Sequence, residues 1–97
     1  MAVSPVITNF KPGQQDVFQV SVNTLWHKYL INGKWNNEAI AGPGGGVAKV
    51  TANFPDQQPQ ITVAGGQIMV TVENDKGQIL YFAQGVNSAT WGAAQLP

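Results

Sequence analysis

Tryptophan and amide side chains are the groups in this sequence best suited to ligand chemistry. Three tryptophans occur, at Trp26, Trp35 and Trp91, and each supplies a flat ring with one N–H donor. The C–H face of a sugar packs on such a ring, while its hydroxyls exchange hydrogen bonds with polar side chains. Trp35 and Trp91 follow turn-like sequence, where binding residues concentrate, so we expect both to contact a ligand. Trp26 lies within a strand-like run, and packing is an equal alternative for it.

Polar side chains near these tryptophans complete the expected binding set. His27 is the only histidine; it either donates to a sugar hydroxyl or is a satisfied surface ring, and the two tyrosines are similar cases. Amide and carboxylate side chains are the expected readers of hydroxyl groups. The expected ligand-binding residues are Trp26, His27, Tyr29, Trp35, Asn36, Glu38, Tyr81, Gln84 and Trp91.

Catalysis and metal binding are not expected. A glycosidase needs two facing carboxylates, one of which donates a proton, and the spacing of the five acids indicates no such pair. His27 has no cysteine or nucleophile at a spacing typical of a metal shell or a triad. The glycine-rich residues 42–46 lack the Lys-Ser/Thr of a phosphate-binding loop. We therefore expect a binding protein, not an enzyme, with no cofactor and no metal.

The charge composition argues against several classes of partner. Charged residues make up 10% of the chain, against about 25% in typical proteins. Five lysines balance five acids, and arginine is absent. Nucleic acids and anionic membrane surfaces require concentrated basic charge, so neither is an expected partner. A neutral ligand is expected instead.

The sequence does not indicate the cellular location of the chain. Residues 1–10 lack the charged and apolar regions of a signal peptide, and no run approaches the roughly 18 apolar residues that cross a bilayer. We therefore expect a soluble protein. Because cysteine is absent, the compartment stays open between the cytoplasm and secretion without a recognisable signal peptide.

Alternating apolar and polar residues run through most of the chain, and no window keeps a 3.6-residue period for three turns. β-Branched and aromatic residues fill these runs. Asn32-Gly33 is the strongest turn signal, because a type I′ hairpin turn needs positive φ at both central residues. The sequence thus predicts an all-β fold, with strands near residues 5–10, 16–22, 25–31, 34–40, 47–54, 60–64, 67–73, 78–84 and 89–95.

Two halves of this single domain, residues 5–42 and 47–97, repeat one pattern. Phe18 and Val20 correspond to Val70 and Val72. Trp35 corresponds to Trp91, and each tryptophan is followed five residues later by an aliphatic residue. A competing register, offset by 44 residues, pairs Gly33 with Gly77. A repeat of roughly 50 residues made of short strands is typical of β-propeller blades. Because two blades cannot close a ring, we expect a homo-oligomer, with a trimer favoured.

The strings Asp16-Val17-Phe18, Leu25-Trp26-His27-Lys28-Tyr29 and Asn32-Gly33 followed by Trp35 resemble the blade repeat of bacterial and fungal propeller lectins, of the Photorhabdus and Psathyrella types. The resemblance implies a propeller fold and sugar binding. The chain is also similar in size to the two-bladed fucose lectins of Ralstonia and Burkholderia, which trimerise into six-bladed rings. Their fucose pocket uses an arginine, so that geometry does not carry over to this arginine-free chain.

The resulting hypothesis is a lectin that recognises neutral glycans in sites repeated around an oligomeric propeller. Two alternatives stay open. One is a non-lectin or engineered propeller-repeat fragment, whose aromatic residues only pack blades together. The other is an Ig-like β-sandwich that serves as an adhesion or structural module. Glycan binding would separate the first alternative, and a monomer in solution would favour the second.

Overall fold

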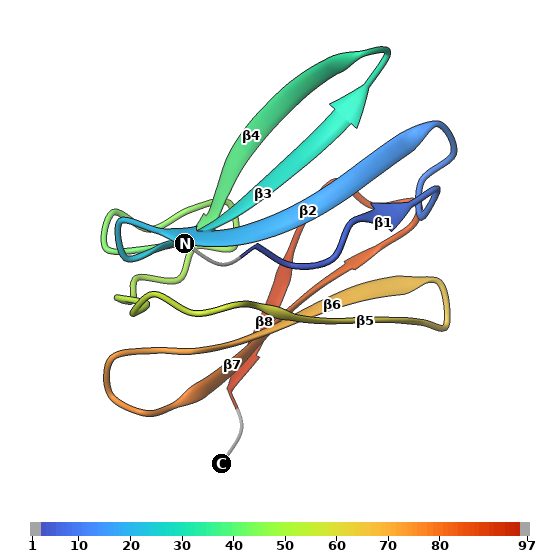
Figure 1. Ribbon diagram of the computed structural model, residues 1–97. Coiled ribbons are helices and arrows are strands. Elements are labelled where there is room, and N and C mark those ends of the chain that lie inside the picture. Colours follow the sequence, from blue (N-terminus) through green and yellow to red (C-terminus); the bar gives the residue numbers. More distant parts are fainter. Residues whose placement is uncertain (1–2, 96–97) are drawn as a thin grey trace.

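The computed structural model describes residues 3–95, which form two four-stranded antiparallel sheets (Figure 1). Each sheet is a meander whose strands lie in chain order. The first sheet contains β1 (Ile7–Thr8), β2 (Gln14–Ser21), β3 (Thr24–Ile31) and β4 (Lys34–Ala41). The second contains β5 (Gln60–Ala64), β6 (Gln67–Glu73), β7 (Ile79–Gly85) and β8 (Gly92–Gln95). The expected all-β class is confirmed.

The strand order differs from that of an immunoglobulin-type sandwich. An immunoglobulin-type sandwich distributes consecutive strands between its two sheets. Here each sheet takes four consecutive strands, and the chain passes from one sheet to the other once, between β4 and β5. Across the described residues, no helix is long and apolar enough to span a membrane.

Tight turns fix the pairing of the first sheet. Val22 and Asn23 join β2 to β3, and Asn32 and Gly33 join β3 to β4. All four have positive φ, between 52° and 74°, which is the type I′ geometry that matches the twist of the flanking strands. The second turn is the one that the sequence predicts. The first was not expected, because a β-branched valine rarely adopts positive φ.

Eight of the nine expected strands are present, but the expected strand at residues 47–54 is wrong. This segment follows the end of β4 closely: Val47 and Ala48 donate to the carbonyls of Ala39 and Ile40. A single bridge joins Gly42 to Thr51. Because the backbone groups bond β4 in this local way, no ladder with a neighbouring strand forms.

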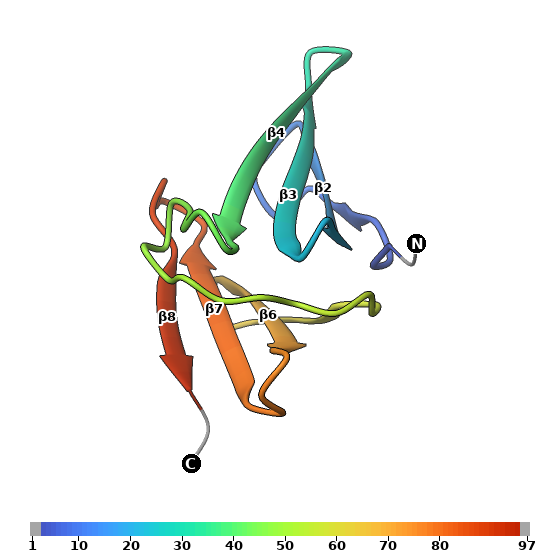
Figure 2. The same ribbon diagram turned by 90° about the vertical axis from the view of Figure 1, so that its left-hand side faces the viewer.

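The two sheets lie against each other (Figure 2), and buried apolar residues from both sheets form one core. Each sheet contributes alternate residues from its central strands, and Phe54 from the connecting segment packs edge-to-face on Phe82 at 6.4 Å. The buried core residues are Phe18, Val20, Leu25, Ile40, Ala41, Phe54, Ile68, Val70, Val72, Leu80, Phe82 and Trp91. Burial of this single shared core holds the two sheets against each other.

The two buried faces are opposite faces of the two meanders. Buried Phe18 directs its N–H and C=O toward the β1 side, where both bond Ser4. In β6, Glu73 directs its N–H and C=O toward Gln57 on the β5 side, so the alternate, buried Val72 directs its own toward β7. In a strand of L-residues that runs in a given direction, a residue whose N–H and C=O point to one neighbouring strand has its side chain on one face of the sheet. A residue whose N–H and C=O point to the other neighbour has its side chain on the opposite face. The sheets therefore pack head to tail, the front of one meander on the back of the other.

Counting residue pairs from the central turns shows which positions correspond. His27 belongs to the fourth pair from the β2–β3 turn. Tyr81 belongs to the fourth pair from the β6–β7 turn, whose first pair is Asn74 and Gln78. His27 and Tyr81 thus occupy corresponding positions in the two sheets.

The same count extends to the last strand of each sheet. His27 pairs with Glu38, and Tyr81 pairs with Ala94. Trp35 and Trp91 precede these partners by three residues each, so the tryptophan-anchored repeat register is confirmed. The 44-residue offset is wrong, because it joins the β3–β4 turn to the β6–β7 turn.

One detail of the expected repeat needs correction. Phe18 and Val70 lie on corresponding strands, but Phe18 directs its backbone toward β1 and Val70 directs its own toward β7. The matching position is one residue away, at Thr71. Because strand side chains alternate between faces, a shift of one residue moves a side chain to the other side of the sheet.

Candidate functional site

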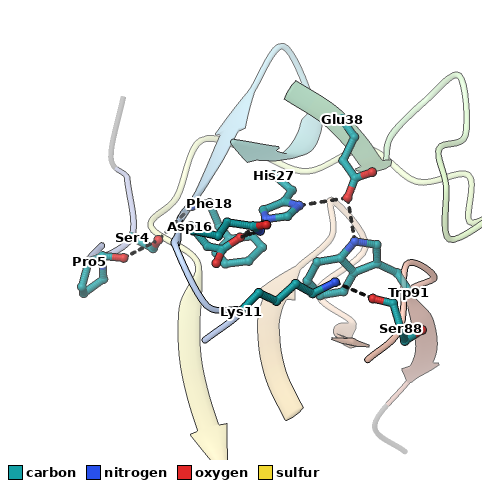
Figure 3. Close-up of polar contacts among 10 residues, drawn as sticks. Ser4, Pro5, Lys11, Asp16, Phe18, His27, Glu38, Ser88 and Trp91 are labelled. Atoms are coloured by element: carbon teal, nitrogen blue, oxygen red, sulfur yellow. Dashed lines mark hydrogen bonds and ion pairs between the residues drawn. The ribbon is translucent and has the colours of Figure 1, made fainter. Parts of the chain in front are cut away.

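A chain of polar side chains crosses the inner face of the first sheet (Figure 3). His27 on β3 bonds Asp16 on β2 through Nε2, at 2.6 Å, and Glu38 on β4 through Nδ1, at 2.9 Å. The Asn32-Gly33 turn sets the second contact, because it places His27 directly opposite Glu38. His27 is 3% exposed and Asp16 is 2% exposed. The site therefore begins as a buried imidazole held between two carboxylates.

The hydrogen-bonding capacity of this cluster is specific. An ionised carboxylate only accepts, whereas an imidazole donates from both nitrogens only when both carry a proton. A doubly protonated His27 donates to both carboxylates; a ring with one proton satisfies one of them. Gln14 adds a donor, since its Nε2 lies 2.7 Å from Asp16 Oδ1. Buried polar groups of this kind are stable when they are paired with one another.

Trp91 connects this cluster to the second sheet. Its indole N–H donates to Glu38 Oε1 at 2.9 Å. Its ring meets Phe18 and His27 edge-to-face, with centroids 5.7 and 5.4 Å away. The His27 ring stacks between Phe18 and Tyr29, both at 4.9 Å. Trp91 is 5% exposed, so it seals the junction between the sheets and offers no open ring for stacking.

A polar cavity of about 200 Å³ opens beside the cluster. Both sheets and the loops at one end of them contribute to its wall. Lys11 closes one side, where its Nζ donates to the carbonyl of Ser88 and so bridges the two halves of the chain (Figure 3). The lining residues are Lys11, Gln14, His27, Tyr29, Glu38, Gln84 and Ala89.

Four of the nine expected binding residues line this cavity, and a fifth lies behind it. His27, Tyr29 and Glu38 come from the first sheet, and Gln84 comes from β7 of the second. Trp91 lies behind Glu38 and holds its carboxylate. Residues from the two repeats, far apart in the sequence, thus meet at one place.

The other four expected residues lie elsewhere. Trp26 is on the outer face of the first sheet and Tyr81 is on the outer face of the second, since each alternates with buried neighbours. Trp35 shares the face of Trp26, because it pairs with Leu30 on β3. Asn36 pairs with Tyr29 but does not line the cavity, and its side chain donates to the Lys34 carbonyl at 3.2 Å. These four residues do not share a single site.

Sequence reasoning missed Lys11, Gln14 and Ala89 as lining residues and Asp16 as the second partner of His27. In a hairpin with a two-residue turn, the residue numbers of every pair add up to the same value. A turn at residues 22–23 therefore places Asp16 opposite Tyr29 and diagonal to His27. That signal was available once the turn was known. Lys11 and Ala89 lie in loops, whose approach depends on the packing of the sheets.

The described residues include no group of three acidic, histidine or cysteine side chains placed to hold a metal ion. Comparisons with protein-family models, curated proteins and solved structures find no match for this chain.

Proposed function

We propose that this chain binds a neutral carbohydrate in the cavity between its two sheets. The observation that carries the proposal is the cavity lining, which combines the ring of Tyr29 with amide, carboxylate and ammonium groups. Sugar hydroxyls both donate and accept hydrogen bonds, so they match a wall that holds both kinds of partner. The tyrosine ring supplies the apolar surface for the C–H groups of the sugar.

The charges around the cavity favour a neutral ligand over an ion. Lys11 is already bonded to Ser88, and Glu38 is bonded to both His27 and Trp91. An ionic ligand would have to compete with these internal partners. The amide of Gln84 remains as the group that can turn toward hydroxyls of either polarity. At about 200 Å³, the cavity suits one sugar residue of a glycan.

A binding role fits this cluster better than a catalytic one. Glycoside hydrolysis requires two carboxyl groups that face the scissile bond, one as acid and one as base or nucleophile. Asp16 and Glu38 each bond His27 through one carboxylate oxygen, so both acids are engaged within the protein. The cluster fixes the shape of the cavity wall and leaves no acid–base pair for a substrate.

We further propose that the two sheets are blade-like units of a propeller-like ring, completed by other copies of the chain, with three chains favoured. The head-to-tail packing of two four-stranded meanders supports this proposal, because the same relation repeated leads around a ring. Each copy would add one cavity. Several weak sites on one rigid ring bind a glycan-covered surface with far greater avidity than a single site.

A glycan array with matched variants tests the carbohydrate site. Gln84→Leu keeps the volume of the side chain while it removes the amide, and Tyr29→Phe removes only the hydroxyl. We expect Gln84→Leu to lose most glycan binding at an unchanged melting temperature, and Tyr29→Phe to lose less. Gln58→Leu, at an exposed position of the connecting segment that does not line the cavity, is the matched control and should bind as the parent does. Equal binding by parent and Gln84→Leu would refute the site.

A further inference from the structure

Trp35 is a tryptophan that the fold of one chain leaves half exposed. It is the second residue of β4, lies on the outer face of the first sheet and is 52% exposed. A large aromatic side chain on a flat sheet face costs solubility unless another surface covers it. Its counterpart in the second sheet, Trp91, is 5% exposed and seals the junction with the first sheet. Corresponding residues therefore have opposite surroundings.

The head-to-tail packing explains this difference. The second sheet uses the face that carries Trp91 to cover the back of the first sheet. The corresponding face of the first sheet carries Trp35, and no part of the described chain covers it. Trp26 lies on the same face, where its indole N–H donates to the Ser21 carbonyl at 3.2 Å. This face of the first sheet thus has the aromatic side chains of an interface, and within the described chain no second sheet packs on it.

The back of the second sheet offers a matching hollow. It measures about 550 Å³ and is lined by apolar or small residues, namely Met69, Tyr81, Ala83, Gly92, Ala93 and Ala94. Tyr81 and Ala94 hold the positions that His27 and Glu38 hold in the first sheet. His27 and Glu38 are two of the groups that contact Trp91 within the chain. If another sheet packed on the second sheet as the second packs on the first, its tryptophan equivalent to Trp91 would therefore lie at this hollow.

We propose that Trp35 of one chain packs into this hollow on a second copy of the chain. The proposal rests on the ring described above and names the residues that close it. The contact is heterologous, since a tryptophan face meets a hollow face, and such contacts form a ring when the rotation between copies closes. Lys28 on the first face and Glu73 on the second are of opposite sign, which suits the pairing. Trp35 is then an anchor for assembly, as buried tryptophans at interface centres commonly are, and it is not a sugar-stacking residue.

Two variants that damage opposite halves of the contact test the proposal. Trp35→Ala removes the anchor, and Ala94→Glu places a charge in the hollow; both positions are exposed in the single chain, so both variants should keep the parental fold by circular dichroism. By native mass spectrometry at micromolar concentration, we expect an oligomer for the parent chain and monomers for each variant. Val63→Ala, which removes an exposed apolar group on the face of the second sheet opposite the hollow, should keep the parental mass.

A mixture of the two variants gives the decisive result. Trp35→Ala retains an intact hollow and Ala94→Glu retains the anchor, so an isotopically labelled 1:1 mixture should form a dimer that contains one chain of each. A parental oligomer that survives in Trp35→Ala, or a mixture that stays monomeric, overturns the proposed contact. A monomeric parent overturns the contact and the ring together. Glycan binding is scored separately on the same samples, so failure of the carbohydrate site is distinguishable from failure of the contact.

Discussion

The two sheets share one strand order but bury different chemistry. The second sheet buries an apolar surface of Ile68, Val70, Val72, Leu80 and Phe82, with Gln84 at its end. The first sheet buries Asp16 and His27 between its apolar residues and places Glu38 beside them. Both sheets supply apolar residues to the core, whereas the first also supplies the polar cluster that shapes a cavity. The repeat thus preserves the scaffold while one copy carries the candidate site.

The outer faces differ in a complementary way. The first sheet presents Trp26 and Trp35, whereas the second presents a hollow lined by alanines, a glycine, Met69 and Tyr81. Because the two repeats have corresponding strands, we infer from this difference that their outer faces pack against different surfaces. The outer face of the first sheet carries tryptophan side chains, and the outer face of the second sheet has a hollow of about 550 Å³.

The largest expected effect comes from the apolar core of the second sheet. Phe82 is fully buried and packs on Phe54 across the junction. Phe82→Ala should lower the free energy of unfolding by about 3–5 kcal/mol, because it opens a cavity that the surroundings only partly fill. Denaturant unfolding at a fixed protein concentration measures this change. Ala83→Ser, the next residue on the outer face, is the control, and an equal loss from both variants would contradict the assignment of faces.

A smaller effect is expected from the polar cluster of the first sheet. Glu38→Ala leaves the Trp91 indole N–H and one His27 nitrogen without a partner, and unsatisfied buried groups cost about 1–3 kcal/mol. Glu38→Gln keeps an oxygen that accepts from Trp91 and should lose less. The same denaturation measurement ranks the two variants. If Glu38→Gln lowered the free energy of unfolding as much as Glu38→Ala, the hydrogen bond from Trp91 would not be the way in which Glu38 stabilises the fold.

Much of the scaffold could be predicted from the sequence, because period-2 alternation and turn residues act locally. Asn32-Gly33 fixed the partner of His27, and eight strands followed from their patterns. The Val22-Asn23 turn could not be recognised, since valine at a φ of 53° goes against local preference. Residues 47–54 have a strand-like composition, but local hydrogen bonds to β4 prevent a ladder.

The candidate site was predictable only in part, because the face on which a residue stands depends on how the sheets pack. Trp35 and Trp91 have the same sequence signature, a turn before and an aliphatic residue five positions later. One is exposed and the other is sealed between the sheets. Periodicity identifies which residues share a face, but not which face is covered. The approach of Lys11 to Ser88 likewise depends on the contact between the two halves.

The three tryptophans provide the most direct test of the central claim, that the polar junction between the sheets binds sugar and the outer tryptophan face does not. Each indole N–H gives its own signal in a ¹⁵N spectrum, as do the side-chain amides of Gln14 and Gln84. Titration with neutral monosaccharides, namely galactose, mannose and N-acetylglucosamine, should shift the two glutamine amides and the indole of Trp91, which bonds Glu38 in the cavity wall. The indole signals of Trp26 and Trp35 should stay in place. Largest shifts at Trp26 or Trp35, with the glutamine amides unmoved, would contradict the account.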